Sequence, residues 1–161
     1  MAIDMYLKVE GATGESQDAN HKEWIDIVSY SWGASQTGAM SGGGGGGAGK
    51  VSFSDLQVLT NLDKATPAIL KYCSSGKHVG EVKLSICKAG GSQIEYATIV
   101  LKDVIVTSTL FSGADNGERI HVNYSFQSSK IEQHYWVQQK DGTKGAESQM
   151  GWDVKENKAT A

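Results

Sequence analysis

The chain has 161 residues, which fits one domain whose core needs no disulfide or metal to stabilise it. Its 15 basic and 18 acidic residues give a formal charge of -3, and only Arg119 is an arginine, which argues against nucleic acid as a partner. No run approaches the ~18 apolar residues of a membrane helix, and the first residues lack a basic and apolar leader, so we expect neither membrane insertion nor a cleaved signal peptide.

Alternating apolar and polar residues predict a strand over residues 3–9, and a polar loop follows over residues 11–22. Residues 24–33 then alternate again and predict a second strand. Its aromatic side chains fall on one face, and two small hydroxyls, Ser29 and Ser31, fall on the other face in line with Ile25 and Ile27. This facing rests on alternation alone, and a β-bulge would invert it.

Glycine is unevenly distributed, because seven of the 20 glycines lie between Gly42 and Gly49. The spacing of Gly44, Gly49 and Lys50 is that of a phosphate-binding loop, but Val51 stands where that motif needs Ser or Thr. Residues 51–54 alternate like a strand, whereas a phosphate loop leads into a helix. We therefore interpret the tract as a loop that becomes ordered against a partner, since ordering glycines costs much conformational entropy.

One helix is predicted over residues 66–75. Thr66 is the expected N-cap, and Pro67 occupies the first turn, where its missing N–H costs nothing. Gly76 is the expected stop. The apolar residues Ile69, Leu70 and Cys73 then share one face of this helix. We expect the helix to pack on the barrel or to cap it.

The rest of the chain again alternates. It predicts strands over 82–86, 94–111, 119–126, 131–137 and 152–154. The segment 94–111 is either one bent strand or two. About eight strands with this spacing are typical of an antiparallel sandwich or barrel. We predict one mainly β domain over 1–161, a barrel of two packed antiparallel sheets with one side helix and a polar tail at about 155–161.

The residues that carry chemistry form no recognisable site. Cys73, His78 and Cys87 lack both a zinc-ligand spacing and a fourth ligand, and no hydrolase motif is present. We therefore expect no catalytic residue, no metal and no cofactor. Two cysteines make no disulfide framework, so we expect the chain to fold in the cytoplasm.

Five segments of the chain, spread in order from end to end, resemble the haemolysin-coregulated protein (Hcp) family, the inner-tube subunits of bacterial type VI secretion systems. They are residues 1–8, 14–33, 46–51, 73–78 and 151–153. The resemblance implies a ring-forming β-barrel, a homohexamer that stacks into a tube inside a contractile sheath, and a spike protein at the tip. It also implies secretion to the extracellular space or a target cell and, for some members, transport of small effector proteins in the lumen of the ring.

The resemblance also implies sites. The long loop at about 38–50 corresponds to the contact between rings, formed by Met40, Ser41, Gly42, Gly43, Gly44, Gly45, Gly46, Gly47, Ala48, Gly49 and Lys50. Ser29 and Ser31 are candidates for facing the lumen and its effectors. The alternative is a secreted monomeric β-barrel that binds a ligand or glycan, which predicts a deep apolar pocket and no ring.

Overall fold

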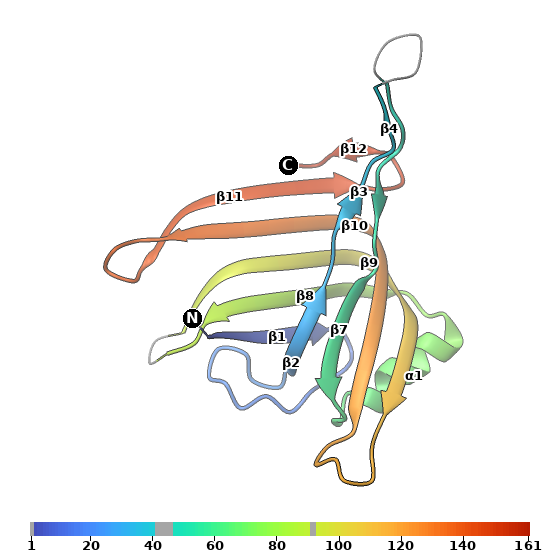
Figure 1. The fold of residues 1–161 in the computed structure, drawn as a ribbon, viewed down its shortest axis with the longest axis vertical. Coiled ribbons are helices and arrows are strands. Elements are labelled where there is room, and N and C mark those ends of the chain that lie inside the picture. Colours follow the sequence, from blue (N-terminus) through green and yellow to red (C-terminus); the bar gives the residue numbers. More distant parts are fainter. Residues whose placement is uncertain (1, 41–46, 91–92) are drawn as a thin grey trace.

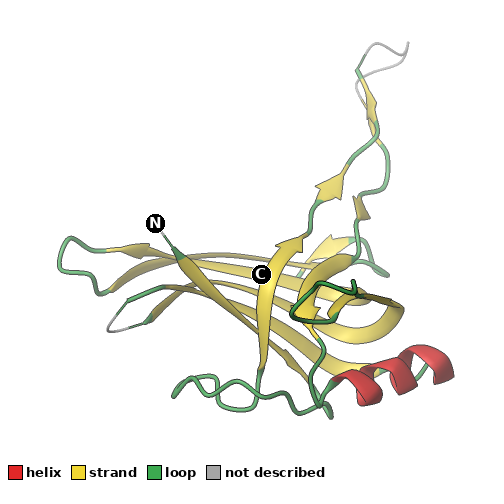
Figure 2. Cartoon of the chain, turned by 60° about the horizontal axis from the view of Figure 1, so that its bottom comes forward, coloured by secondary structure: helices red, strands yellow, loops and turns green. Residues whose placement is uncertain are grey.

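The computed structural model describes residues 2–40, 47–90 and 93–161, and the described chain is mainly β (Figure 1). The strands are β1 (Ile3–Val9), β2 (Ile25–Ser31), β3 (Ala34–Ser35), β4 (Gly38–Ala39), β5 (Gly47–Ala48), β6 (Ser52–Phe53), β7 (Leu56–Asn61), β8 (Val79–Lys88), β9 (Ile94–Ser112), β10 (His121–Gln138), β11 (Lys144–Asp153) and β12 (Lys158–Ala159). The helix α1 (Thr66–Ser75) lies at the side of the barrel and matches the predicted residues (Figure 2).

One antiparallel sheet makes the barrel. Its strand order is β12-β11-β10-β7-β2-β1-β8-β9, and β10 also pairs with β9, which closes a barrel of the six strands from β10 to β9. The long strands β9 and β10 take part in both layers of the barrel (Figure 1). The mainly β barrel with a side helix is therefore confirmed, and its two layers belong to one continuous hydrogen-bonded sheet.

Apolar side chains from every barrel strand fill the interior. Those with almost no exposed surface include Leu7, Ile25, Leu56, Val58, Leu84, Leu101, Tyr124, Phe126 and Ile131. They recur at every second position because successive side chains of a strand point to opposite faces. Removal of this apolar surface from water is the main stabilising contribution to the barrel.

The segment 94–111 is one bent strand, because β9 runs through Asp103 with a φ of 54°. The Asp103 carboxylate accepts hydrogen bonds from His78 and Ser129, each at 2.8 Å. The bond from His78 makes the largest contribution to lowering the pKa of Asp103 to about 2. At the bend, the Asp103 side chain therefore connects β9 to Ser129 of β10 and to His78, which directly precedes β8.

The start of α1 differs from the prediction. The N-cap is Ala65 rather than Thr66, and the Asp63 carboxylate accepts the Ala65 backbone N–H at 2.9 Å. The Thr66 hydroxyl is instead 2.7 Å from the buried hydroxyl of Tyr124, so it joins the helix to the core. Gly76 ends the helix as predicted, with a φ of 68°. Among the described residues, no helix is long and apolar enough to cross a membrane.

Several strands differ from the prediction. The predicted strands over 119–126 and 131–137 are one continuous strand, β10, and β12 lies within the predicted polar tail. The short ribbon strands β3, β4 and β5 were not predicted, nor was β7.

The alternation of β7 is obscured by Leu59, an apolar residue on the outer face of the sheet. In β11, residues 146–149 are all exposed, so this part of the strand gives no apolar period, and only the end of β11 near Trp152 was predicted. β11 pairs with the second half of β10 and extends the sheet beyond the barrel (Figure 1).

Candidate functional site: a polar sheet face and a protruding ribbon

Four strand segments form a sheet with a polar outer face. They are β2, β7, the first half of β10 and the second half of β9, side by side in that order (Figure 1). Paired residues of antiparallel strands point to the same face. The outer face therefore has three rows: Ser31, Gln57, Ser125, Ser108; then Ser29, Leu59, Asn123, Leu110; then Asn61, His121, Ser112. We call this set the polar face.

Cross-strand contacts support this assignment. Ser108 Oγ donates a hydrogen bond to Ser125 Oγ at 3.0 Å across the first row. The core side of the same strands carries Val58, Val122 and Tyr124, all buried. The four-stranded segment is therefore apolar toward the barrel interior and polar outward.

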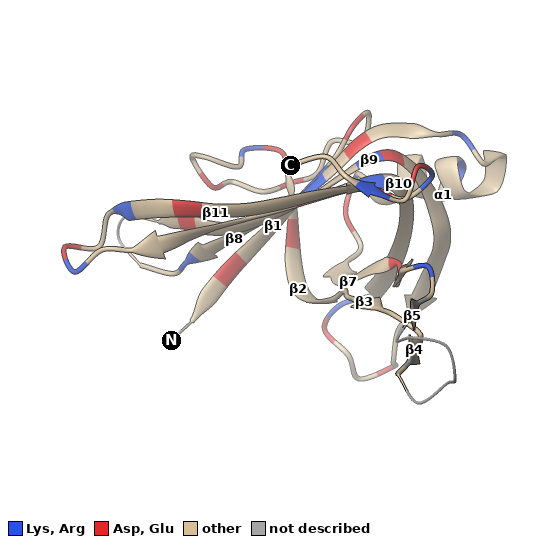
Figure 3. Ribbon diagram, turned by 90° about the horizontal axis from the view of Figure 1, so that it is seen from above, with Lys and Arg blue, Asp and Glu red and all other residues tan. Residues whose placement is uncertain are grey.

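The polar face has almost no charge. β7, residues 104–112 of β9 and residues 121–129 of β10 contain no Lys, Arg, Asp or Glu. The nearby carboxylate of Asp55 is bonded to Thr107 at 2.6 Å and to Gln127 at 3.5 Å. Charged residues lie instead on strands such as β1, β8 and β11 and on the loops (Figure 3). The face thus offers short hydroxyl and amide groups to whatever lies against it.

The structure corrects the facing predicted for Ser29 and Ser31. The pairing of β2 with β7 goes from Ile27 opposite Thr60 to Ser29 opposite Leu59, so Val28 is an extra residue, a β-bulge. Ile27 is buried on the core side, whereas both serines are exposed on the opposite side. The prediction that they share a face with Ile25 and Ile27 is wrong. Their contact with a lumen or an effector stays a prediction.

Most of the polar face was not predicted. The alternation of residues 119–126 gave the polar positions of β10, but nothing in that segment indicates which strands lie beside it. Gln57, Asn123, Ser108 and Ser125 come together only through the register of β7, β10 and β9. The sequence does not show that β10 pairs with β7 on one side and with β9 on the other.

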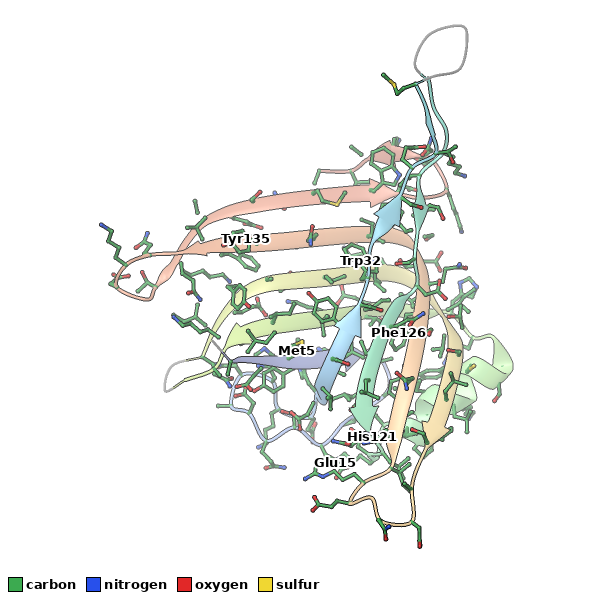
Figure 4. The ribbon with its side chains drawn as sticks, in the orientation of Figure 1. Met5, Glu15, Trp32, His121, Phe126 and Tyr135 are labelled. Atoms are coloured by element: carbon green, nitrogen blue, oxygen red, sulfur yellow. The ribbon has the colours of Figure 1, made fainter. Side chains whose placement is uncertain are left out.

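The second feature is a ribbon that leaves the barrel between β2 and β7. β3 pairs with β6, and farther out β4 pairs with β5 (Figure 2). Stacked rings of Trp32 and Phe53, with centroids 6.2 Å apart, mark its base (Figure 4 labels Trp32). Of the proposed contact loop, Met40 is 83% exposed and Lys50 is exposed. Ser41 and Gly42–Gly46 lie outside the described residues.

A cavity of about 580 Å³ lies at the base of the ribbon. Its apolar walls include Trp32, Phe53, Leu101 and Phe126. Among the polar residues that line it, Asp103 accepts bonds from His78, Ser129 and Lys155. The alternative of a monomeric binding module predicts a deep apolar pocket, whereas this cavity is partly open to solvent and is lined by polar and charged residues as well as apolar ones.

The three residues considered as metal ligands are not brought together. Within residues 2–40, 47–90 and 93–161, no three His, Cys, Asp or Glu side chains are grouped as a metal site. His78 bonds to Asp103, and Cys73 lies on α1. Cys87 is buried in β8, and burial raises the pKa of its thiol. A buried thiol of raised pKa is a poor nucleophile.

Comparison with known proteins gives a consistent result. The family described as "Type VI secretion system effector, Hcp" matches residues 6–135. "Protein hcp1" of Pseudomonas aeruginosa is 43% identical over 159 residues, 98% of each chain. A solved "type six secretion system protein" superposes with a TM-score of 0.93 at 29% identity, covering 99% of this chain and 100% of that one. Hcp1 from Salmonella typhimurium superposes with a TM-score of 0.83 at 35% identity over 99% of both chains. The chain therefore belongs to the Hcp family of type VI secretion systems.

Proposed function

We propose that the chain is an inner-tube subunit that assembles into hexameric rings, and that stacked rings are propelled and secreted. The observation that carries the proposal is the polar face, an almost uncharged sheet surface on an otherwise charged molecule. Such a surface suits a lumen that carries cargo, because hydroxyl and amide groups can hydrogen-bond to a cargo protein without fixing it by ion pairs. Membership of the Hcp family supports the same assignment.

The sheet edges beside the polar face support closure of a ring. A closed ring needs two complementary surfaces on each subunit, joined head to tail. Among the described residues, β2 beyond Ile27 and β9 beyond Val104 each have a paired neighbour on one side only. The two edges bound the four-stranded segment on opposite sides. Open edges of this kind pair readily with another chain, so they are suited to contacts between subunits.

The ribbon supports stacking. In Figure 1 it occupies one end of the long axis, and the loop between β9 and β10 occupies the opposite end. Head-to-tail stacking along this axis brings the ribbon of one ring, including Met40, against the next ring. In this assembly the contractile sheath surrounds the tube, the spike protein caps it, and small effector proteins occupy the lumen. Delivery would take the folded protein to the extracellular space or a target cell.

Sedimentation velocity of the purified protein tests the ring. We expect a species with six times the mass of the 17.2 kDa chain at micromolar concentration. A head-to-tail interface gives a closed ring when the rotation between subunits closes, and an open helical filament when it does not. A monomer at every concentration would contradict the proposal and favour the alternative, a secreted monomeric barrel whose ligand occupies the 580 Å³ cavity.

A bulky side chain on the polar face tests the lumen. We expect Ser31→Trp to reduce co-purification of small effectors about tenfold, a loss of ~1.4 kcal/mol of binding, while hexamers persist. The reason is that Ser31 is exposed in the first row of the polar face, where an indole would cover its neighbours. Ser74→Trp on the exposed side of α1 is the matched control. Equal effector recovery from both variants would exclude Ser31 from the effector surface.

A further inference from the structure

The two sides of the polar face carry opposite charge. On one side, residues 14–26 run into β2 and carry four acidic residues and one lysine. On the other side, residues 66–78 comprise α1 and the residues after it, and they carry Lys71 and Lys77 but no Asp or Glu. We call residues 14–26 the acidic flank and residues 66–78 the basic flank. This separation of charge is not visible in the formal charge of -3 of the whole chain.

The flanks lie at opposite edges of the four-stranded segment. The acidic flank runs into β2, which beyond Ile27 has a paired neighbour on one side only. The basic flank contains α1, which packs against β9, the strand at the other edge. Figure 1 and Figure 2 both show the loop before β2 on one side of this segment and α1 on the other. Head-to-tail contact therefore brings the acidic flank of one subunit toward the basic flank of the next.

The charges on both flanks are accessible to a partner. The side chains of Glu23, Asp26, Lys71 and Lys77 are all exposed. Within the described parts of the chain, none of these four takes part in an ion pair. Lys77 also lies 5.5 Å from the centre of the Tyr72 ring, which holds its ammonium group near the surface of α1. Each flank thus carries charges that its own subunit does not neutralise by ion pairing.

A hollow beside the acidic flank suits an ammonium group. It has a volume of about 210 Å³, and its charged lining residues are Glu15, Asp26, Asp63 and Arg119. Burial raises the pKa of Asp63, and repulsion from the carboxylates of Glu15 and Asp26 raises it further. Carboxylates that repel one another favour the approach of a positive group, and one guanidinium does not balance three of them.

Exposed apolar side chains accompany the charges on both sides. Val28 and Tyr30 lie on β2 directly after the acidic flank, while Leu70 of α1 and Phe111 of β9 lie on the other side. These four side chains are 39% to 51% exposed. Contact between the two sides would remove apolar surface from water, which stabilises association, while the charges determine which surfaces meet.

We propose that the acidic flank of each subunit pairs with the basic flank of the next, so that electrostatic attraction sets the head-to-tail contact of the ring. This pairing rests on the proposed ring and names the surfaces that join it. The partner of each flank is a second copy of this chain, because every copy carries both signs of charge on opposite sides. Two acidic or two basic flanks repel each other, which disfavours a two-fold dimer and favours the head-to-tail arrangement.

Charge reversal on one flank at a time tests the pairing. Glu23→Lys/Asp26→Lys gives a subunit with two positive flanks, and Lys71→Glu/Lys77→Glu gives one with two negative flanks. Because like charges then meet at every contact, we expect the protein concentration at which half of the chains form rings to rise about tenfold or more for each variant alone. Sedimentation velocity measures this concentration.

An equimolar mixture of the two variants should form rings again, because a positive flank of one variant then meets a negative flank of the other. The two variants should alternate around the ring, which closes for a hexamer, and native mass spectrometry should find three copies of each. Absence of rings from a mixture of variants whose far-ultraviolet circular dichroism matches that of the wild type would overturn the proposal.

The matched control is Lys130→Glu/Lys158→Glu, which reverses two exposed lysines that belong to neither flank. We expect it to form rings at the wild-type concentration. Equal loss of rings in the control and in the flank variants would overturn the proposal, as would normal rings from either flank variant alone. Absence of rings from the wild type would instead contradict the proposed tube function.

Salt tests the same contact without a substitution. An increase of NaCl from about 0.1 M to about 1 M shortens the Debye length from about 10 Å to about 3 Å. We expect the concentration at which half of the wild-type chains form rings to rise about threefold or more, while apolar contacts preserve part of the association. A concentration that does not change with salt would overturn the proposal.

Discussion

Replacement of residues 39–47 by Asn-Gly is expected to leave hexameric rings intact and to abolish their stacking. Gly38 and Ala48 are directly paired across the ribbon, so a two-residue Asn-Gly turn can close the hairpin between them. None of the residues of this segment that the structure describes belongs to the barrel core. We expect ring mass to be unchanged in sedimentation velocity, and tubes to be absent by electron microscopy under conditions in which the wild type forms them.

The matched control for this replacement is Met40→Ser, which keeps the length of the ribbon and removes its exposed apolar side chain. If only the shortened variant fails to form tubes, stacking depends on the length of the ribbon. If both variants fail to form tubes, stacking depends on contacts made by the Met40 side chain. Normal tubes and normal secretion by the shortened variant would contradict the proposed role of residues 38–50.

The largest expected effect on stability comes from truncation of the core. Leu84→Ala should lower the free energy of unfolding by about 2–5 kcal/mol, a large part of the roughly 5–15 kcal/mol of a typical domain. Leu84 has no exposed surface and lies on β8 directly between Leu7 of β1 and Ile99 of β9. A substitution there removes contacts with two strands and leaves a cavity. Denaturant unfolding at fixed protein concentration measures the change, since assembly also contributes to apparent stability.

Leu110→Ala is the control for that measurement. Leu110 has the same chemistry but is 62% exposed on the polar face. We expect its substitution to change the free energy of unfolding by less than about 0.5 kcal/mol. Equal effects of the two substitutions would mean that the interior of the barrel is not packed as described.

Local signals were sufficient for the helix and for the first strand. Pro67 and Gly76 fix the ends of α1 through backbone geometry, so the predicted residues 66–75 match the structure. The strict alternation of residues 3–9 likewise gave β1. These features depend on residues close in sequence, and the prediction needed no knowledge of the neighbouring strands.

Features that depend on tertiary pairing could not be predicted. The bulge at Val28 follows from the register of β2 against β7, and it reverses the facing of Ser29 and Ser31 relative to Ile27. Thr66 has the residue type of an N-cap, but its hydroxyl bonds to Tyr124, 58 residues away, and α1 has Ala65 as its N-cap, without a side-chain capping bond. In each case a distant partner overrode the local preference.

The candidate site was predicted only in part. Ser29 and Ser31 were identified by sequence, whereas Gln57, Ser108 and Ser125 complete their row through pairing across three strands. The two charged flanks show the same limit. The charges of residues 14–26 and 66–78 can be counted in the sequence, whereas only the order of the strands places the two segments on opposite sides of the polar face.

The ring is the central claim, and negative-stain electron microscopy of the purified protein tests it most directly. A head-to-tail contact between the two open sheet edges, with the polar face turned inward, predicts rings with six-fold symmetry and a central hole. Class averages with six subunits around an open lumen are the expected result. Featureless monomer-sized particles at micromolar concentration would contradict the account.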